Sequence, residues 1–363
     1  MNPLRELRID LEAYRRNVRT IRERVAPAKV LAVVKANAYG HGAVPIARAA
    51  VEAGADWLGV VTLEEALELR AAGITAPVVA WQFDPACDFH AAAWNHIDVG
   101  LSYAAQLVAA AEAGVQWVHL AIDTGLSRNG SSPEQWEEFL TTAARLQQEG
   151  RLRVRGVFSH LSNTSWEDDR EQLHQFDAAL ARAAELGIHP EVRHIAATQV
   201  AVDHPEARYD MVRLGIGGYG VSPDDRSSAE LGLTPVMRVS GRVIHVKRVP
   251  ADTGVSYGFL YRTPRETTLA LVPFGYADGV PRSVTNRAEV LLNGHRYRIA
   301  GRVAMDQFLV DVGDDPVQIG DEVVLFGDPA RGEPSAAEWA EAAGTIAYEI
   351  VTRMGGRCER VYR

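Results

Sequence analysis

The sequence predicts an α/β protein, with a (β/α)8 TIM barrel followed by a mostly β C-terminal domain. Short apolar runs alternate with longer, alanine-rich amphipathic segments from about residue 29 to residue 217. Beyond about residue 232, strand-like runs follow one another closely instead. Alternating strands and helices are typical of a parallel sheet, whereas closely spaced strands indicate an antiparallel β domain. We therefore expect an N-terminal strand at residues 1–10 that joins the β domain, a barrel over 11–230 and the β domain over 231–363.

Eight apolar runs predict the barrel strands. They lie at residues 29–35, 57–61, 78–81, 97–101, 117–123, 154–160, 192–197 and 211–217. Helix starts separate them, since Thr62 with Glu65 and Ser132 with Gln135 both fit the capping-box pattern. Eight strands joined by helices match a closed barrel. An open doubly wound sheet is the alternative, but it does not account for the count of eight.

The second part of the chain carries the pattern of a β domain. Strand-like runs lie at residues 237–249, 267–274, 288–301, 307–313 and 321–327. Asn293 and Gly294 predict a tight hairpin turn, because both residue types accept a positive φ. Residues 335–353 read as helical, and the polar, turn-rich residues 221–235 read as the connection between the two domains.

Composition and charge exclude several classes of protein. The 363 residues are 47% hydrophobic and carry a net charge of -9, and no Lys/Arg run exceeds two residues, which argues against a nucleic-acid or basic membrane-binding surface. The first twenty residues carry charges where an export signal needs an apolar core, so we expect a cytoplasmic protein without membrane contact. The sequence has only two cysteines, and its histidines do not stand at the spacing of paired metal ligands, so we expect no metal site. The expected partner is a small molecule or a second copy of the chain.

Lys35 stands at the end of the first apolar run, in "VVKANAYGHG". A buried ammonium is costly, so a lysine in this place is paired, extended toward water or chemically committed. Active sites of barrels lie at the carboxyl ends of the strands. Besides Lys35, those positions hold Arg128, His160, Thr198, Arg213 and the glycine-rich stretch 215–218. Each alone has an ordinary explanation, such as a core histidine, a helix cap, a surface ion pair or a flexible loop.

Together these residues suit one cofactor. The loops after the seventh and eighth barrel strands commonly hold a phosphate, and "GIGGYG" at 215–220 offers backbone N–H groups beside the Thr198 hydroxyl. A phosphate site opposite a barrel lysine suggests pyridoxal 5'-phosphate, bound to Lys35 as a Schiff base. Arg213 would then hydrogen-bond the pyridine nitrogen, where it tunes the electronics of the ring.

Motifs over the whole chain resemble those of the alanine racemase family of fold-type III pyridoxal-phosphate enzymes. The motifs are "VVKANAYGHG", "DTGLSRNG", "GVFSHLSN", "RLGIGGYG", "VSYGFLY", "PFGYADG", "GRVAMDQ" and the ending "YEIVTRMGGRCERVY". The decapeptide around Lys35 is the most specific of them. Its combination with "VSYG" and "GRVAMD" in the predicted β domain separates racemases from relatives that consist of the barrel alone.

The resemblance implies interconversion of L-alanine and D-alanine, which would supply D-alanine for peptidoglycan. It implies Lys35 as the cofactor lysine and Tyr257 of "VSYG" as the second acid/base. Removing a proton from one face of a planar intermediate and returning one to the other needs two such groups. In the family the tyrosine comes from the partner subunit, so the resemblance also implies a homodimer with shared active sites.

Further positions follow from the same resemblance. The phosphate would be surrounded by Tyr39, Thr198, Gly215, Ile216 and Tyr348. Arg128 would face the substrate carboxylate, and Met305 would supply a backbone donor from the second subunit. His160 resembles the histidine that contacts Tyr257. A free tyrosine has a pKa of about 10, so we expect His160 and Arg213, as cations, to stabilise the phenolate.

Two positions depart from the family pattern. Many relatives carry a lysine two residues before "DTG" that positions the substrate arginine, whereas this chain has Ala121. Relatives can also carry a tyrosine near the C-terminus that narrows the substrate entrance, where this chain has Gly355 or Gly356. A wider entrance would admit serine beside alanine.

Other functions compatible with a barrel lysine are less well supported. A non-catalytic pyridoxal-phosphate carrier consists of the barrel alone, without the second domain. An amino-acid decarboxylase on the same plan needs a β-domain cysteine near the cofactor, and Cys358 lies far beyond the expected motif. A plain barrel hydrolase or aldolase would need carboxylate pairs at other strand ends.

Overall fold

The computed structural model describes residues 3–363. The chain divides into two compact units. The barrel unit comprises Val18–Ala38 and Ile46–Gly218. The β unit comprises the residues up to Asn17, Tyr39–Pro45 and Tyr219–Arg363. The segment after Lys35 therefore changes unit at Tyr39.

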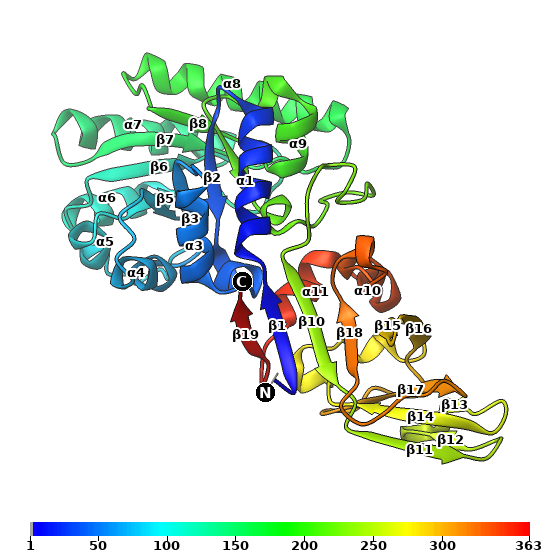
Figure 1. The fold of residues 1–363 in the computed structure, drawn as a ribbon. Helices are drawn as coiled ribbons and strands as arrows, with labels where there is room; N and C mark the ends of the chain where they lie inside the picture. The colour runs from blue at the N-terminus through cyan, green and yellow to red at the C-terminus, as the bar shows by residue number, and fades with distance from the viewer. Residues whose placement is uncertain (1–2) are drawn as a thin grey trace. The chain divides into compact units, whose positions relative to one another are not determined.

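Eight parallel strands form the sheet of the barrel unit, in the order β8-β7-β6-β5-β4-β3-β2-β9 (Figure 1). They are β2 (Lys29–Val33), β3 (Trp57–Val60), β4 (Val78–Ala80), β5 (Asp98–Leu101), β6 (Trp117–Ala121), β7 (Arg153–Phe158), β8 (Val192–His194) and β9 (Met211–Leu214). An Ala197–Arg213 bridge and a hydrogen bond of 3.0 Å from the Arg213 N–H to the Ala196 carbonyl join β9 to the chain just after β8. The predicted barrel is thereby confirmed, and each predicted run overlaps one strand.

One helix precedes β2, and helices follow the barrel strands from β2 to β8 (Figure 1). They are α1 (Leu11–Val25), α2 (Lys35–Tyr39), α3 (Ala43–Glu52), α4 (Leu63–Ala71), α5 (His90–Trp94), α6 (Ala104–Glu112), α7 (Trp136–Gln148), α8 (Trp166–Glu185) and α9 (Thr198–Asp203). The predicted capping box opens α4, since Thr62 accepts from the Glu65 N–H at 3.3 Å and Glu65 accepts from the Thr62 N–H at 3.4 Å. Gln135 likewise accepts from the Ser132 N–H, but this contact opens a 3-10 turn that precedes α7.

The β unit holds a six-stranded sheet, in the order β16-β15-β18-β10-β1-β19, a three-stranded sheet, in the order β11-β14-β17, and the pair β12-β13 (Figure 1). The strands are β1 (Arg5–Ile9), β10 (Met237–Arg242), β11 (His245–Val249), β12 (Gly254–Val255), β13 (Tyr261–Arg262), β14 (Thr267–Val272), β15 (Glu289–Leu292), β16 (His295–Arg298), β17 (Phe308–Gly313), β18 (Glu322–Phe326) and β19 (Glu359–Tyr362). β1 pairs antiparallel with β10 and parallel with β19.

Local backbone chemistry explains two details of this unit. Asn293 and Gly294 have φ values of 50° and 83°, which is the tight turn expected between β15 and β16. The helical segment expected at 335–353 is instead two helices, α10 (Ala336–Ala343) and α11 (Ala347–Arg353). Gly344, with φ 73°, adopts the left-handed conformation that ends the first of them.

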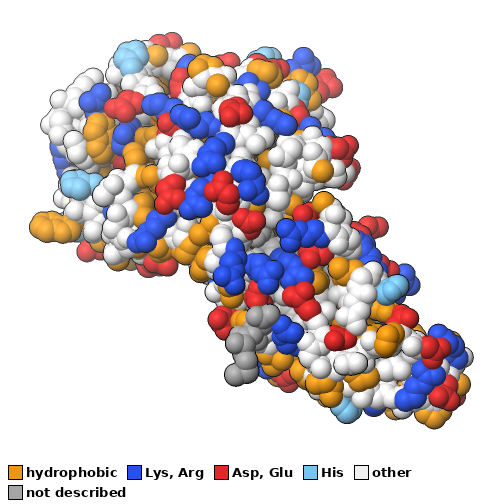
Figure 2. Space-filling model, in the orientation of Figure 1, with side chains coloured by type: hydrophobic (Ala, Val, Ile, Leu, Met, Phe, Trp, Pro, Cys, Tyr) orange, Lys and Arg blue, Asp and Glu red, His pale blue; other side chains and the backbone are white. Residues whose placement is uncertain are grey.

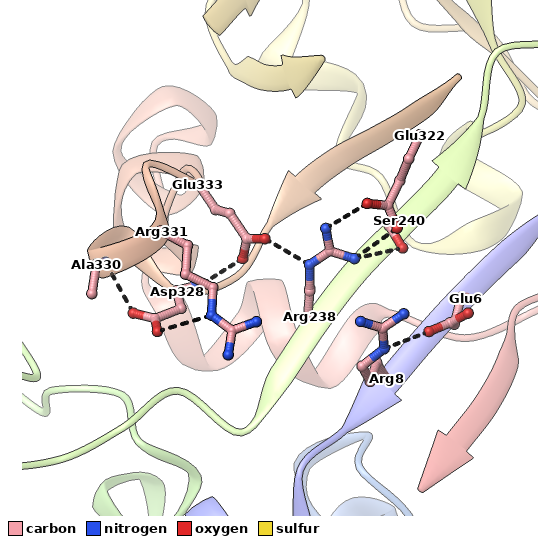
Figure 3. Close-up of polar contacts among 9 residues, drawn as sticks. All are labelled: Glu6, Arg8, Arg238, Ser240, Glu322, Asp328, Ala330, Arg331 and Glu333. Atoms are coloured by element: carbon pink, nitrogen blue, oxygen red, sulfur yellow. Dashed lines mark hydrogen bonds and ion pairs between the residues drawn. The ribbon is translucent and has the colours of Figure 1, made fainter. Parts of the chain in front are cut away.

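Arg238 on β10 joins this strand through ion pairs to β18 and to the loop that holds Glu333 (Figure 3). Its guanidinium contacts Glu322 of β18 at 2.9 Å and Glu333 at 2.6 Å. The Glu333 side chain is only 5% exposed, so this pair is largely shielded from water. Hydrogen bonds from Arg238 hold the pKa of Glu322 below its usual value.

Charged side chains of both signs are intermixed on the face drawn in Figure 2. Charged side chains of the described residues form local ion pairs, such as Arg182 with Glu137 and Arg265 with Asp314. Among the described residues, no helix is long and apolar enough to cross a membrane.

Candidate active site

The chain leaves the barrel after β2 in a left-handed turn that begins just after Lys35. Ala36, Asn37 and Ala38 have φ 52° with ψ of 46–54°, and Tyr39 also has φ 52°. For residues other than glycine this conformation costs roughly 1–2 kcal/mol each. Strain of this kind persists only where surrounding contacts impose it, and it is common at functional sites. The turn directs the backbone away from the strand, so that Lys35 stays at the carboxyl end of β2.

Glu65 of α4 holds the start of this turn. One carboxylate oxygen accepts from the Ala36 N–H at 2.6 Å, and the other accepts from the Val61 N–H at 2.8 Å. The same side chain completes the capping box with Thr62. One carboxylate therefore fixes both the helix start after β3 and the strained turn after β2.

The electrostatic surroundings of Lys35 are positive. Burial lowers the pKa of its ammonium, and the charges of Arg128 and Arg213 lower it further, while Glu65 acts in the opposite direction. A lowered pKa raises the fraction of neutral amine, which is the form that attacks carbonyl groups and accepts protons. A cluster of three cations also favours an anionic ligand, such as a phosphate or a carboxylate.

Arg213 of β9 is 7% exposed and donates to several neutral acceptors. One terminal nitrogen lies 3.1 Å from both the carbonyl oxygen and Nδ1 of His194. The other contacts the Ser159 and Ile195 carbonyl oxygens and Nδ1 of His160, each at 2.8 Å. These contacts fix the plane of the guanidinium at the carboxyl ends of β7, β8 and β9.

His160 does not carry the charge that we expected of it. Burial, together with the charges of Arg213, Arg128 and Lys35, lowers its pKa to about 3. Arginine can only donate hydrogen bonds, so Nδ1 of His160 accepts from Arg213 and the proton of the neutral ring is on Nε2. The expectation that His160 acts as a cation is therefore wrong, and the ring offers a neutral N–H donor instead.

The loop after β9 lies against the first turn of α9. The Thr198 hydroxyl accepts from the Gly215 N–H at 3.3 Å, and Thr198 is 4% exposed. A Cβ atom at Gly217 would lie 2.5 Å from the Thr198 methyl group, so this close approach requires glycine. Ile216 begins a 3-10 turn at the same place, and the first N–H groups of such a turn lack partners within it.

Arg128 lies in the loop after β6 and is exposed. The ends of this loop are tied by hydrogen bonds between Asp123 and Ser131 and between Ser131 and Ala121. The side chain of Asn129 accepts from the Ser102 hydroxyl at 3.0 Å, and Ala121 is 3% exposed at the end of β6. The field of Arg128 nevertheless reaches both Lys35 and His160.

The remaining predicted residues belong to the β unit. The ring of Tyr39 packs between Tyr219 at 4.7 Å and Tyr348 at 6.4 Å, measured between ring centroids. Burial raises the pKa of Tyr348 to about 12. The Tyr348 hydroxyl is therefore a protonated donor near neutral pH.

Tyr257 and Met305 are exposed, at 69% and 53%. Tyr257 lines a concave pocket with Phe259 and Gln307. Ser256, just before it, has φ 60° and ψ -172°, a rare conformation for a residue with a side chain, and its hydroxyl donates to the Arg302 carbonyl at 2.7 Å. The backbone that presents Tyr257 is thus held in one specific shape.

Two residues of this site were missed from the sequence. Glu65 was interpreted only as part of a helix cap, although its second oxygen reaches the turn after Lys35. His194 ends β8, level with Phe158 at the end of β7, and this place at a barrel strand end was the available signal.

Family models match both parts of the chain. The model described as the N-terminal domain of alanine racemase matches residues 9–223, and the model described as its C-terminal domain matches residues 236–362. The chain belongs to the alanine racemase family. Alanine racemases depend on pyridoxal 5'-phosphate and are isomerases, so this cofactor and this class of reaction apply to the chain.

Individual alanine racemases agree over the full length. The alanine racemase of Thermobifida fusca is 47% identical, covering 100% of this chain and 99% of its own length. The crystal structure of alanine racemase from D-cycloserine-producing Streptomyces lavendulae is 48% identical, with a TM-score of 0.98 over 100% of this chain and 98% of that one. Alanine racemase from Bacillus anthracis, solved with bound L-Ala-P, is 33% identical, with a TM-score of 0.91 over 100% of this chain and 96% of that one.

The residues around Lys35 fit the cofactor of alanine racemases. The lowered pKa of Lys35 suits covalent attachment to an aldehyde, and the positive charges of Arg128 and Arg213 suit a phosphate and a carboxylate. Gly217 has no side chain, and the Thr198 side chain packs directly against it. A glycine-rich turn with free N–H groups is a common feature of anion-binding loops.

Proposed function

We propose that this enzyme interconverts L-alanine and D-alanine, with pyridoxal phosphate attached to Nζ of Lys35 and with Lys35 and Tyr257 as the two acid/base groups. The barrel domain, residues 11–230, would hold the cofactor, and residues 231–363 with the strand of 1–10 would supply Tyr257. The observation that carries the proposal is the lowered pKa of Lys35, a lysine placed among cations at a barrel strand end. It is supported by the relative solved with bound L-Ala-P.

Lys35 would exchange the Cα proton on one face of the substrate. When bound, pyridoxal phosphate supplies a conjugated ring that withdraws electrons from Cα and makes its proton acidic. A lysine of lowered pKa accepts that proton more readily near neutral pH than an ordinary ammonium could. Glu65 would hold the backbone just after Lys35, through its contact with the Ala36 N–H.

Tyr257 would exchange the proton on the opposite face. We propose that Nε2–H of His160 donates to the phenolate oxygen, because its Nδ1 is already occupied by Arg213. The Tyr257 phenolate is then stabilised by one neutral donor, His160, which is itself hydrogen-bonded to the cation of Arg213. This replaces the pair of cations expected from the sequence.

Arg213 would face the ring nitrogen of the cofactor. An arginine keeps its protons throughout the physiological range, so it can donate a hydrogen bond to the ring but cannot protonate it. The ring then stores less negative charge than it would beside a carboxylic acid. Proton exchange at Cα is favoured over transamination for this reason.

Other residues would bind the two anionic groups. Arg128 would hold the substrate carboxylate, with a backbone donor from Met305. The phosphate would be held by Tyr39, Thr198, Gly215, Ile216 and Tyr348. The rings of Tyr39 and Tyr348 lie 6.4 Å apart between centroids, which supports a shared ligand.

We also propose a homodimer in which each active site combines the barrel of one subunit with Tyr257 and Met305 of the other. Support comes from the exposed apolar side chains around these residues, since Phe259 and Leu260 are 60% and 51% exposed. Neighbouring exposed apolar groups are typical of an interface. We propose that the enzyme is cytoplasmic and that it supplies D-alanine for peptidoglycan.

A chiral assay over the twenty L-amino acids tests the substrate. We expect D-alanine as the main product, with serine at most a minor substrate, and loss of the visible cofactor band on treatment with borohydride. Carbon dioxide release without D-amino acid would indicate a decarboxylase. Faster turnover of serine than of alanine would replace the proposal with a broader racemase.

A further inference from the structure

A chain of buried polar side chains crosses the barrel unit from Arg213 to Asp98. Arg213 contacts Nδ1 of His194 at 3.1 Å, and Nε2 of His194 lies 3.2 Å from Nδ1 of His119. Nε2 of His119 then lies 3.3 Å from Oδ2 of Asp98. His119 and His194 are 0% and 1% exposed, and Asp98 is 2% exposed. The chain links β9, β8, β6 and β5.

The chemistry of its two ends fixes every proton in between. Arginine only donates, so Nδ1 of His194 has a lone pair and the proton of the neutral ring is on Nε2. That proton points at Nδ1 of His119, which must therefore accept. The proton of His119 is then on Nε2, where it is donated to the Asp98 carboxylate. Each of the three contacts holds one proton.

This arrangement excludes a further proton. If His119 became a cation, two N–H groups would meet in the contact with His194, because Nδ1 of His194 cannot take the second proton while it accepts from Arg213. Burial and the charge of Arg213 also keep the pKa of His194 well below its usual value. Among the four hydrogen-bonded side chains Arg213, His194, His119 and Asp98, Arg213 is therefore the one cation.

The surrounding residues are built around the two rings. A Cβ atom at Gly156 would lie 2.1 Å from Nδ1 of His119, so glycine makes room for the ring. Phe158 stacks on His194, with 5.1 Å between centroids and 8° between planes. At the far end Arg155 contacts Asp98 at 3.3 Å and lies over the ring of Trp57.

We propose that His119 and Asp98 are positioning residues for the reaction, which orient Arg213 through His194 and lock both histidines in the Nε2–H form. The inference rests on the proposed function, in which Arg213 faces the cofactor ring. If the proton of His194 were on Nδ1 instead of Nε2, the ring would present an N–H group to the guanidinium and displace it. Asp98 sets the direction of the whole chain because it can only accept.

Neutron diffraction from crystals of the perdeuterated protein tests the proton positions, with or without cofactor. We expect deuterium on Nε2 of both His119 and His194 and none on either Nδ1. Deuterium on Nδ1 of either ring, or on both nitrogens of His119, would overturn the proposal. Because this measurement needs no turnover, it stands apart from the proposed function.

Kinetics test the positioning role. His119→Leu leaves His194 without its acceptor, and we expect kcat to fall about tenfold or more while KM changes by less than about twofold, with a shifted cofactor absorbance band. His119→Gln can accept from His194 and donate to Asp98, so we expect kcat within about threefold of the parent enzyme. Asp98→Leu removes the oxygen that accepts from His119, so it should resemble His119→Leu. The control is Asp88→Asn, which breaks an exposed Asp88–His90 contact of 2.6 Å and should change nothing.

The outcomes separate the proposals. Equal kcat in the Leu and Gln variants, or a fall in kcat of His119→Leu no larger than that of the control, would overturn the positioning role. Should His119→Leu fail to fold, Asp98→Leu and the neutron structure still decide the matter. A parent protein that binds pyridoxal phosphate but does not racemise alanine contradicts the proposed function instead, and leaves the proton positions open to the same diffraction test.

Discussion

Replacing Glu65 by alanine should release the strained turn that follows Lys35. Glu65 accepts hydrogen bonds from the N–H groups of Ala36, Val61 and Thr62, at 2.6, 2.8 and 3.4 Å. Four successive residues of the turn have φ 52°. At roughly 1–2 kcal/mol for each such residue, the turn needs support from outside itself. Removing the carboxylate takes away the contact at its first residue.

The structure sets the size of the effect. A hydrogen bond to a charged group contributes about 1.5–3 kcal/mol, so the two short bonds of Glu65 together give roughly 3–6 kcal/mol. The side chain is partly exposed and water replaces some of these bonds, so we expect Glu65→Ala to lower the free energy of unfolding by about 3 kcal/mol. The loss of the carboxylate also removes the group that raises the pKa of Lys35.

Urea unfolding at one fixed protein concentration measures the loss of stability. Titration with pyridoxal phosphate measures the effect on Lys35, through its affinity for the cofactor. The matched control is Glu64→Ala, one residue earlier on the same helix, where the side chain is exposed and the loss should stay below about 1 kcal/mol. We expect weaker cofactor binding only in Glu65→Ala. Equal stability and equal cofactor affinity in the two variants would refute the assigned role of Glu65.

Two further predictions concern pH and the β unit. His160 stays neutral in the folded protein down to a pKa of about 3, whereas the unfolded chain takes up a proton there below about pH 6.5. The free energy of unfolding should therefore fall as the pH drops from 6.5 toward 3, by up to roughly 1.4 kcal/mol per pH unit from this group. Urea titrations of the cofactor-free protein should show a shallower pH dependence for His160→Gln, and equal slopes would contradict the low pKa. In the β unit, Arg238→Met leaves the shielded Glu333 without its ion pair and should cost about 3 kcal/mol in thermal or urea unfolding. Arg248→Met, which breaks exposed pairs with Glu266 and Asp314, should cost much less, and the reverse order would show that shielding does not decide the effect.

The fold could be predicted because the barrel follows from local patterns. Each apolar run is long enough for one strand, and capping residues such as Thr62 mark the helix starts between them. The positions of Lys35 and Arg213 followed from the rule that active-site residues lie at strand ends. The break at Gly344 was missed because a glycine inside a helical pattern does not by itself show whether the helix continues.

Other parts of the site depend on contacts that no local pattern contains. Within residues 36–39 only Asn37 readily adopts a left-handed conformation, so the turn depends on contacts such as that of Glu65, twenty-nine positions away from Ala36. The charge of His160 depends on its distance from Arg213, which the sequence does not give. The alignment of Asp98, His119 and His194 likewise appears only when three separate strands are brought together.

Subunit mixing tests the central claim, that Lys35 of one subunit and Tyr257 of the other exchange the proton at a shared site. Lys35→Ala and Tyr257→Phe homodimers should each be inactive in racemisation of L-alanine. After subunit exchange, half of the dimers are mixed and each mixed dimer has one intact site of two, so about one quarter of the parent activity should return. Recovery close to that value, in a mixture whose exchange is confirmed by mass spectrometry of the intact dimers, is the predicted result. No recovery in fully exchanged dimers, or near-parent activity in either homodimer before mixing, would contradict the account.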